Sequence, residues 1–402
     1  MIGLGAMLGA GVFAAPGPAT AAAGGWVLVS LGLAAVVAYC NATSSAQLAA
    51  LHPEAGGTYV YARERLGGYW GFLAGWSFVV GKTASLAAMA LTVGAYVAPD
   101  LARPIGIAAV VALTAVNYRG VEKTARLTRV IVAVVLVVLA LVVAAALVGG
   151  DAVPPSSAGA APTSPWGVLQ GAGLLFFAFA GYARIATLGE EVADPARTIP
   201  RAIPLALGIV VAVYAVVLGT GLRAVGAEGL AGSRAPLADV VAAGGWSALE
   251  PVVRVGAAVA AGGVLLSLLA GVSRTTLAMA RRRELPGWLD AVHPTHRTPH
   301  HAEVAAAAIV IAIVLVADLR GAIGFSSLAV LTYYGLANAS AFTLRGAERR
   351  WPRWLAGLGV ALCAVLALTL PPVAVVGGAA LLAAGSLVWA VARRTVGASG
   401  RG

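Results

Sequence analysis

The chain has 402 residues, of which 60% are hydrophobic and 11% charged, and its mean hydropathy is +0.90. About one quarter of the residues in a soluble domain are charged, so this composition excludes an ordinary soluble protein. The net charge of +11 could indicate a nucleic-acid partner, but the arginines are spread over short loops between apolar blocks, so we predict none.

The apolar blocks are about 20 residues long, the length that a helix needs to cross a hydrocarbon core of about 30 Å. The chain lacks the strand-like alternation of a membrane barrel. We therefore predict an all-α integral membrane protein. About twelve transmembrane helices are expected at residues 1–22, 26–51, 69–97, 104–118, 128–148, 167–189, 200–221, 251–280, 302–318, 322–343, 354–370 and 372–392.

The first predicted helix contains the glycine-rich stretch GAMLGAGVF, from Gly5 to Phe13. Glycine allows a helix to unwind, and unwound backbone is tolerated at membrane depth only where it lines a cavity or binds something. The helix that restarts after such a break would direct its positive end at a carboxylate. The alternative is a small-residue face for helix packing.

The first basic residue is Arg63, so the start has no positively charged region of a signal peptide. We expect a membrane helix that lacks its usual cytoplasmic lead-in. Only about eight residues, roughly 12 Å of helix, precede the break. We therefore expect either that further coding sequence lies upstream, or that the closure of the bundle at its cytoplasmic end is weakened.

Lys82 lies deep inside the third predicted helix. An ammonium group at that depth is costly, so we expect it to face the bundle interior and to be paired or functional. Burial also disfavours the charged form of a lysine, which would suit proton exchange and makes Lys82 a coupling candidate. The alternative is a structural lysine bonded to carbonyls of a broken helix.

The sixth predicted helix is interrupted in turn, at Phe179-Ala180-Gly181. A pair of interrupted helices at corresponding positions in two halves points to a transporter site at the membrane midplane. The pair predicts a transporter core at 1–345, built from two five-helix repeats at about 1–148 and 167–345. Residues 346–402 would then form helices 11 and 12 and a short tail.

The connecting segments add smaller predictions. We expect an irregular outer loop at 151–165 and short helices within 222–250. His293, His296, His300 and His301 lie in an inner loop among prolines without a helical framework, so no metal site is predicted. Cys40 and Cys363 are interpreted as small core residues. Glu190 and Glu191 are interpreted as members of an inner salt-bridge network.

The basic residues set the orientation. With the N-terminus inside, 19 Lys and Arg residues fall in inner loops and the tail and 5 in outer loops, while Lys82, Arg184 and Arg274 lie within apolar blocks. The positive-inside rule then places both termini in the cytoplasm and supports an even number of helices. We expect a multi-pass protein of the cytoplasmic membrane.

The chain resembles the amino acid–polyamine–organocation (APC) superfamily of permeases. The matching stretches are the first-helix motif, PEAGGTYVYARERLG at 53–67, FFAFAGY with GEEVADPARTIPRAI, and SRTTLAMARRRELPGWLDAVHP at 273–294. They occur in the family's order over most of the first 345 residues. The resemblance implies a LeuT-type fold of inverted repeats with broken helices 1 and 6, which works by alternating access.

The resemblance also implies the substrate contacts. The substrate carboxylate would meet backbone N–H groups of Gly9, Ala10 and Gly11. Its ammonium would meet carbonyls of both breaks, which are those of Met7, Phe177 and Ala180, and Phe177 would close over it from outside. Backbone dipoles can hold a zwitterion whatever its side chain.

Two features depart from the family pattern. Many relatives have an acidic residue after the Gly-aromatic pair of helix 6, where this chain has Ala183 and Arg184. Some relatives have a lysine in helix 5 that replaces a sodium ion, whereas 130–148 contains no charged residue. Both absences leave the usual coupling residues unassigned.

We therefore expect a permease for an amino acid or related amine, coupled to protons by symport, with membrane lipid as its surroundings and no cofactor. An uncoupled exchanger and a non-transporting sensor or scaffold of the same fold remain alternatives. A membrane-embedded enzyme would need convergent nucleophiles, metal ligands or carboxylates at membrane depth, and the sequence suggests none.

Overall fold

The computed structural model describes residues 7–52, 56–120, 125–149, 164–182 and 195–399, and within these ranges every regular element is a helix. Seven helical stretches in the described chain are long and apolar enough to cross a membrane, and three shorter apolar helices accompany them. The α-helices are α2 (Gly11–Ala14), α3 (Pro16–Ala23), α4 (Val27–Leu51), α5 (Thr58–Leu66), α6 (Gly68–Val97), α7 (Ala102–Tyr118), α8 (Ala125–Val148), α9 (Pro165–Phe179), α11 (Pro195–Gly232), α12 (Pro236–Ala243), α13 (Glu250–Arg281), α14 (His300–Val316), α15 (Leu319–Phe342), α16 (Arg353–Thr369) and α17 (Pro372–Ser399).

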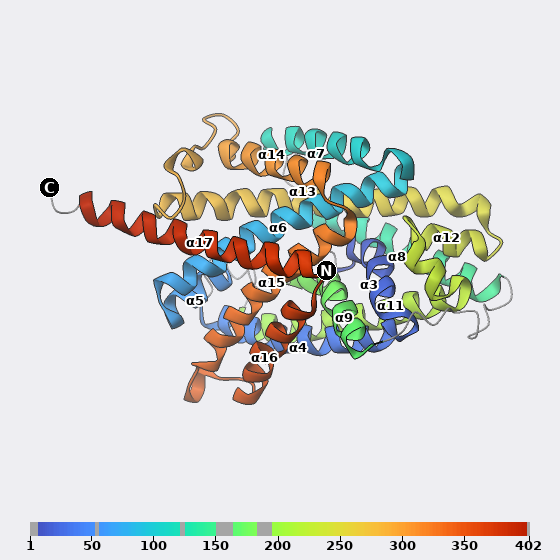
Figure 1. Ribbon diagram of the computed structural model, residues 1–402, viewed down its shortest axis with the longest axis horizontal. Helices are drawn as coiled ribbons and strands as arrows, with labels where there is room; N and C mark the ends of the chain where they lie inside the picture. The colour runs from blue at the N-terminus through green and yellow to red at the C-terminus, as the bar shows by residue number, and fades with distance from the viewer. Residues whose placement is uncertain (1–6, 53–55, 121–124, 150–163, 183–194, 400–402) are drawn as a thin grey trace.

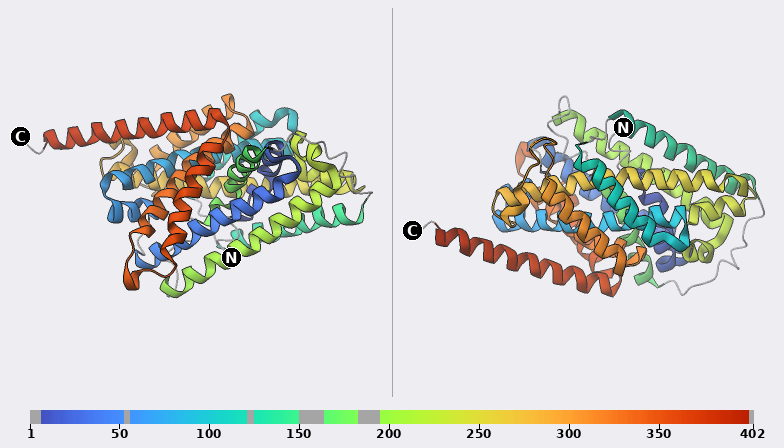
Figure 2. Two further views of the ribbon diagram at one scale, coloured as in Figure 1. Left: turned by 60° about the horizontal axis from the view of Figure 1, so that its bottom comes forward. Right: turned by 90° about the horizontal axis from the view of Figure 1, so that it is seen from above.

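The helices form an elongated bundle in which α6, α13 and α17 run along the long axis (Figure 1). Helix α17 lies along one side, and its C-terminal end extends beyond the other helices in every view (Figure 2). Its outward residues are apolar and strongly exposed, including Val373 at 85% and Leu387 at 68%. Such a surface suits contact with lipid chains.

Three expectations from the sequence need correction or extension. Residues 58–66, which lie between two predicted membrane helices where no helix was expected, form the nine-residue helix α5, bounded by Gly57 and Gly67, both with positive φ. Helix α11 does not end near 221 but continues to Gly232 across a kink at Gly226. The short helix predicted within 222–250 is present as α12. The predicted outer loop falls almost wholly outside the described residues.

Helix α6 is the centre of the bundle. In its most apolar stretch 83% of the residues are buried, against 11% for the stretch that contains α7. It packs against α13, α15, α7 and α5. Small residues allow this close packing: a Cβ added at Gly81 would lie 2.8 Å from the Cβ of Ala329 in α15. Lys82 therefore lies on the helix that is most enclosed by protein.

Two contacts of connecting segments lie toward opposite ends of the bundle. At one end α5 contacts the segment after α13, through Arg63 and Glu284. At the other end the N–H of Leu237 in α12 donates to Tyr96 Oη near the end of α6 (3.4 Å). In Figure 1 α5 lies toward the left end and α12 toward the right end.

The contact between α6 and α7 yields a test of this packing. A Cβ added at Gly94 would lie 1.9 Å from the carbonyl oxygen of Ala102. Because backbone cannot move aside without separating the two helices, we predict that Gly94→Ala destabilises the fold by about 1–3 kcal/mol or more. The measurement is the midpoint of thermal unfolding in detergent.

Gly219→Ala in α11 is the matched control, since nothing lies within 4 Å of its added Cβ. We expect this variant to unfold at the wild-type temperature. An unchanged midpoint for Gly94→Ala would contradict the observed distance between α6 and α7.

Candidate functional site

The first apolar segment is interrupted where the glycines predict it. Residues 8–10 are not helical, and α2 begins at Gly11. The Ala10 carbonyl accepts the first hydrogen bonds of the new turn, from the N–H groups of Phe13 and Ala14, each at 3.0 Å. The N–H groups of a first helical turn have no partner within the helix, so they are available to another group.

Gly11 brings this break against the second interrupted segment. A Cβ at Gly11 would lie 2.6 Å from the Cα of Ala178 in α9. Even alanine would therefore force the two backbones apart, so helix packing requires a glycine at this position.

Helix α9 ends at Phe179, and residues Ala180–Tyr182 form a 3₁₀ turn. The N–H of Ala180 donates to the Phe177 carbonyl in this tightened turn. The predicted continuation of helix 6, including Arg184, Glu190 and Glu191, lies outside the described residues. The break at Ala180 begins where the sequence predicts it.

Tyr214 of α11 connects the two broken segments. Its hydroxyl oxygen lies 2.5 Å from the Met7 carbonyl oxygen and 3.1 Å from that of Ala178. A phenol has one proton, so it donates to one of these carbonyls at a time. The small void beside it, lined by residues such as Gly11 and Ala178, has a volume of ≈ 10 Å³. That volume suits about one water molecule, so the segments are closed against each other.

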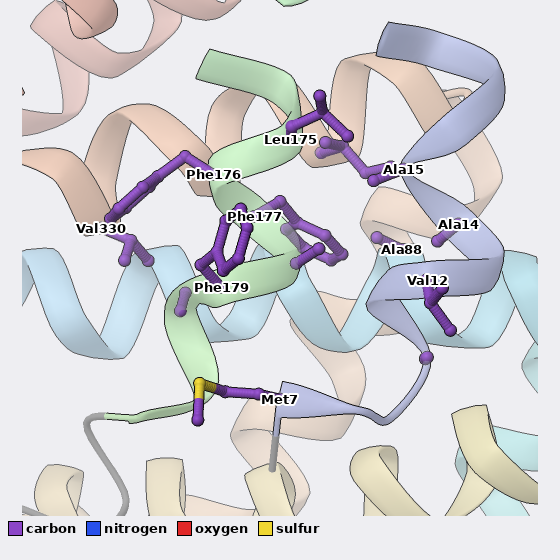
Figure 3. Packing of buried hydrophobic residues seen from close by; sticks show 14 of the residues in the cluster. Met7, Val12, Ala14, Ala15, Ala88, Leu175, Phe176, Phe177, Phe179 and Val330 are labelled. Carbon is purple, nitrogen blue, oxygen red and sulfur yellow. The ribbon is translucent and has the colours of Figure 1, made fainter. Parts of the chain in front are cut away.

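The close-up view shows the two segments side by side (Figure 3). Val12, Ala14 and Ala15 lie on one, and Leu175 to Phe179 on the other. Met7 lies beneath the end of α9, while Phe176 points toward Val330 of α15. The ring of Phe177 is buried, at 8% exposure.

The Ala180 carbonyl has two donors. Lys82 Nζ lies 3.4 Å from its oxygen and Tyr334 Oη of α15 lies 3.2 Å from it. Lys82 is 6% exposed, so its ammonium group is enclosed by the bundle. The third and sixth membrane segments are therefore joined at the break through a charged side chain.

Tyr96 makes a similar bond nearer the other end of α6. Its hydroxyl donates to the Phe13 carbonyl at 3.2 Å, and the two rings meet edge to face at 5.7 Å. The same oxygen accepts the N–H of Leu237, so α12 is tied to the restarted part of the first helix.

The structure places Gly11 against Ala178, bonds Lys82 to Ala180, and links Met7 to Ala178 through Tyr214. Gly9 and Ala10 belong to the non-helical residues just before α2, and Phe177 is buried near the end of α9.

Sequence reasoning missed Tyr96, Tyr214 and Tyr334, whose hydroxyls donate to carbonyls at or near the breaks. Tyr96 and Tyr214 lie in apolar stretches with no tyrosine beside them, and Tyr334 follows Tyr333 in α15, where no motif marks it. The sequence could have indicated these residues in one way: a tyrosine inside an apolar helix carries a hydroxyl group that needs a hydrogen-bond partner when it is buried.

A polar network joins α5 to the segment after α13, at the end of the bundle that the basic residues predict to be cytoplasmic. Glu284 accepts from Arg63 and from the Tyr59 hydroxyl (2.7 Å), and the Arg282 guanidinium lies over the Tyr59 ring. Burial and the neighbouring Glu284 carboxylate raise the pKa of Tyr59 above its ordinary value. The phenol therefore stays protonated and able to donate at neutral pH.

The histidines differ in part from their prediction. His300 and His301 are not loop residues, because they begin α14. The rings of His293, His296 and His300 surround Tyr118 at 5.4–6.3 Å. Across the described ranges no three His, Cys, Asp or Glu side chains are grouped so that they could hold a metal ion.

Comparison with known proteins places these features in a family. The family described as amino acid permease matches residues 1–395. The uncharacterized transporter Rv1999c of Mycobacterium tuberculosis is 60% identical over 393 residues, which cover 98% of this chain and 89% of that protein. The branched-chain amino acid permease BcaP of Bacillus subtilis is 25% identical over 75% of this chain and 69% of its own length. The methylthioribose transporter of the same organism is 28% identical over 74% and 69%.

The bond pattern at Tyr214 predicts a local effect of its removal. Tyr214→Phe would leave the Met7 and Ala178 carbonyls without this donor, and the loss of such a buried bond costs about 1–3 kcal/mol. We expect amide hydrogen exchange of peptides covering residues 8–15 and 175–182 to become roughly 5- to 150-fold faster.

Tyr69→Phe serves as the control, because the Tyr69 hydroxyl bonds Ser386 of α17 and not a break. Its exchange at 8–15 should match that of the wild-type protein. Equal protection of these peptides in Tyr214→Phe would mean that the hydroxyl does not hold the breaks.

The inner network predicts a difference between two ion pairs. Glu284 is 6% exposed at its side chain, whereas Glu348, which pairs with Arg65, is 42% exposed. Glu284→Gln leaves a half-buried guanidinium without its carboxylate, and we expect a loss of about 1–3 kcal/mol. Glu348→Gln should cost at most about 1 kcal/mol, since its pair is screened by solvent. Chemical unfolding of both variants gives the comparison, and equal losses would contradict it.

Proposed function

The chain belongs to the amino acid permease family of the APC superfamily, and on that premise we propose that it is a secondary transporter of an amino acid or related amine. It acts by alternating access in the cytoplasmic membrane. The observation that carries the proposal is the contact between the two interrupted segments, where Tyr214 bonds carbonyls of both. Interrupted helices that meet inside a bundle are the usual binding site of such transporters.

The proposed architecture is the LeuT-type arrangement of two inverted five-helix repeats followed by two further helices. The breaks at residues 8–10 and at Ala180 support it, since they fall in the first and sixth apolar segments of the chain. The excess of Lys and Arg in the inner loops favours cytoplasmic termini.

The substrate site that we propose lies between the breaks. The carboxylate would accept from the N–H groups of Gly9, Ala10 and Gly11, and the carbonyls of Met7, Phe177 and Ala180 would surround the other end. The structure is closed here, with room for about one water molecule, so a substrate requires the segments to separate. Alternating access provides that separation.

The names of the similar proteins give different substrates, so they do not restrict the substrate of this chain to one chemical class. One similar protein is a branched-chain amino acid permease and another a methylthioribose transporter. A site made of backbone groups can serve such different molecules, because the side chains around it decide which one fits.

We assign proton coupling to Lys82. It lies near the middle of α6, and its ammonium group bonds the carbonyl at the second break. A group that gains and loses a proton there would couple proton movement to substrate binding, which is symport. An uncoupled exchanger is the alternative if Lys82 keeps one protonation state, and a non-transporting sensor is the alternative if the breaks never separate.

Uptake into proteoliposomes tests the function and the coupling together. We predict that wild-type protein accumulates labelled substrate when an inward proton gradient is imposed, and that a protonophore abolishes the accumulation. Lys82→Met should abolish gradient-driven accumulation while exchange at saturating substrate continues, because exchange needs no net proton movement.

Thr114→Val on the exposed α7 provides a control, since its hydroxyl bonds only its own helix, at the Val110 carbonyl. It should accumulate substrate as the wild type does. Wild-type pH dependence in Lys82→Met would mean that another group carries the proton. Folded wild-type protein that neither accumulates nor exchanges substrate would favour the sensor.

A further inference from the structure

Lys82 is a buried cation with no carboxylate partner among the described residues. Within that part of the chain its one hydrogen bond is the long one to the Ala180 carbonyl. An ammonium group that is 6% exposed loses most of its hydration, and a single neutral carbonyl compensates only part of that loss.

The described helices around Lys82 place no carboxylate beside it. Helices α2, α3, α4, α6, α7, α9, α15 and α17 contain no Asp or Glu at all. On the other helices packed against α6, Glu64 of α5 is exposed, Glu250 bonds Arg254 within α13, and Glu303 lies in the first turn of α14. Lys82 lies 14 residues into α6, about 21 Å along the helix from its inner end.

The carbonyls around the break are also already in use. The Ala180 oxygen accepts from Lys82 and Tyr334, that of Phe177 accepts the N–H of Ala180, and that of Met7 accepts from Tyr214. These carbonyls are the groups proposed to hold a substrate ammonium group. In this conformation the Lys82 ammonium group provides the positive charge beside the Ala180 carbonyl instead.

We propose that Lys82 is the specificity-determining residue of the site and that it selects small carboxylates with a net negative charge. This inference rests on the proposed transport function. It replaces the open class of amino acids and related amines with carboxylates of net negative charge. Among amino acids the acidic ones meet the condition, and organic monocarboxylates without an ammonium group meet it equally.

The net charge of the occupied site gives the physical reason. With a neutral zwitterion bound, the site keeps the uncompensated charge of Lys82, and with a cation it holds two positive charges. An anion brings the sum to zero and can accept a charge-assisted hydrogen bond from the ammonium group. In an environment of low dielectric constant this difference is large, so selection by charge should be strong.

Uptake of four labelled probes into proteoliposomes provides the test: L-glutamate, pyruvate, L-leucine and L-lysine. We expect the wild-type protein to take up glutamate or pyruvate at least tenfold faster than leucine at equal concentration, with lysine slowest. Faster uptake of glutamate than of pyruvate would mean that the site accepts the ammonium group of the substrate. Faster uptake of pyruvate would mean that the Lys82 ammonium group takes the place of the substrate ammonium group.

Three variants make the test specific. In counterflow exchange, which this variant should retain, Lys82→Met should raise the apparent KM for the preferred anion roughly tenfold or more, the effect of losing one charge-assisted hydrogen bond, and should narrow the preference for that anion over leucine. Lys82→Arg should keep the order of the probes. Ser85→Ala, one turn further along α6, removes a buried hydroxyl bonded to Ser326 and should leave the order unchanged. Monodisperse elution and thermal unfolding establish that each variant is folded.

The outcomes separate this inference from the transport function. Uptake of leucine or lysine at the rate of the anions, or an unchanged preference in folded Lys82→Met, would overturn the assignment to Lys82 and leave transport standing. Folded wild-type protein that takes up none of the four probes would count against both.

Discussion

The backbone carbonyls at the two helix breaks have to find donors, and the rest of the site is arranged around that requirement. In an apolar interior an unsatisfied carbonyl costs several kcal/mol, and lipid cannot supply a hydrogen bond. The chain provides three tyrosine hydroxyls and one ammonium group, from Tyr96, Tyr214, Tyr334 and Lys82. Two of these four donors lie on α6, one on α11 and one on α15, so the bonds fix the two broken segments against three helices.

The same bonds make the site able to change. Hydroxyl and ammonium donors can exchange one acceptor for another at small cost, whereas the backbone bonds of an unbroken helix cannot. At the proposed site a substrate would have to replace bonds that the protein makes with itself. The free energy of binding is then the difference between the bonds made to the substrate and the bonds made within the closed protein. A change of charge at Lys82 can therefore change the sign of that difference.

The two ends of the bundle are held by different means. Near α5, Arg63, Tyr59 and Glu284 form a largely buried ionic network, while near α12 the paired Arg234 and Asp100 are 67% and 99% exposed. Partly buried ion pairs are lost at greater cost than exposed ones. The network near α5 therefore stabilises this conformation more than the exposed pair does.

The sequence by itself determined the membrane class, most helix positions and the place of the first break, because length, hydropathy and glycine content act locally. The sequence also marked Lys82, since a charge within an apolar helix is conspicuous. It could not identify the partners of the break carbonyls, because Tyr214 and Tyr334 lie far from Met7 and Ala180 in the chain and carry no local motif. Only the tertiary structure decided that Gly11 meets Ala178, and that Lys82 bonds the Ala180 carbonyl with no acid among the described residues beside it, since both depend on how separate helices pack.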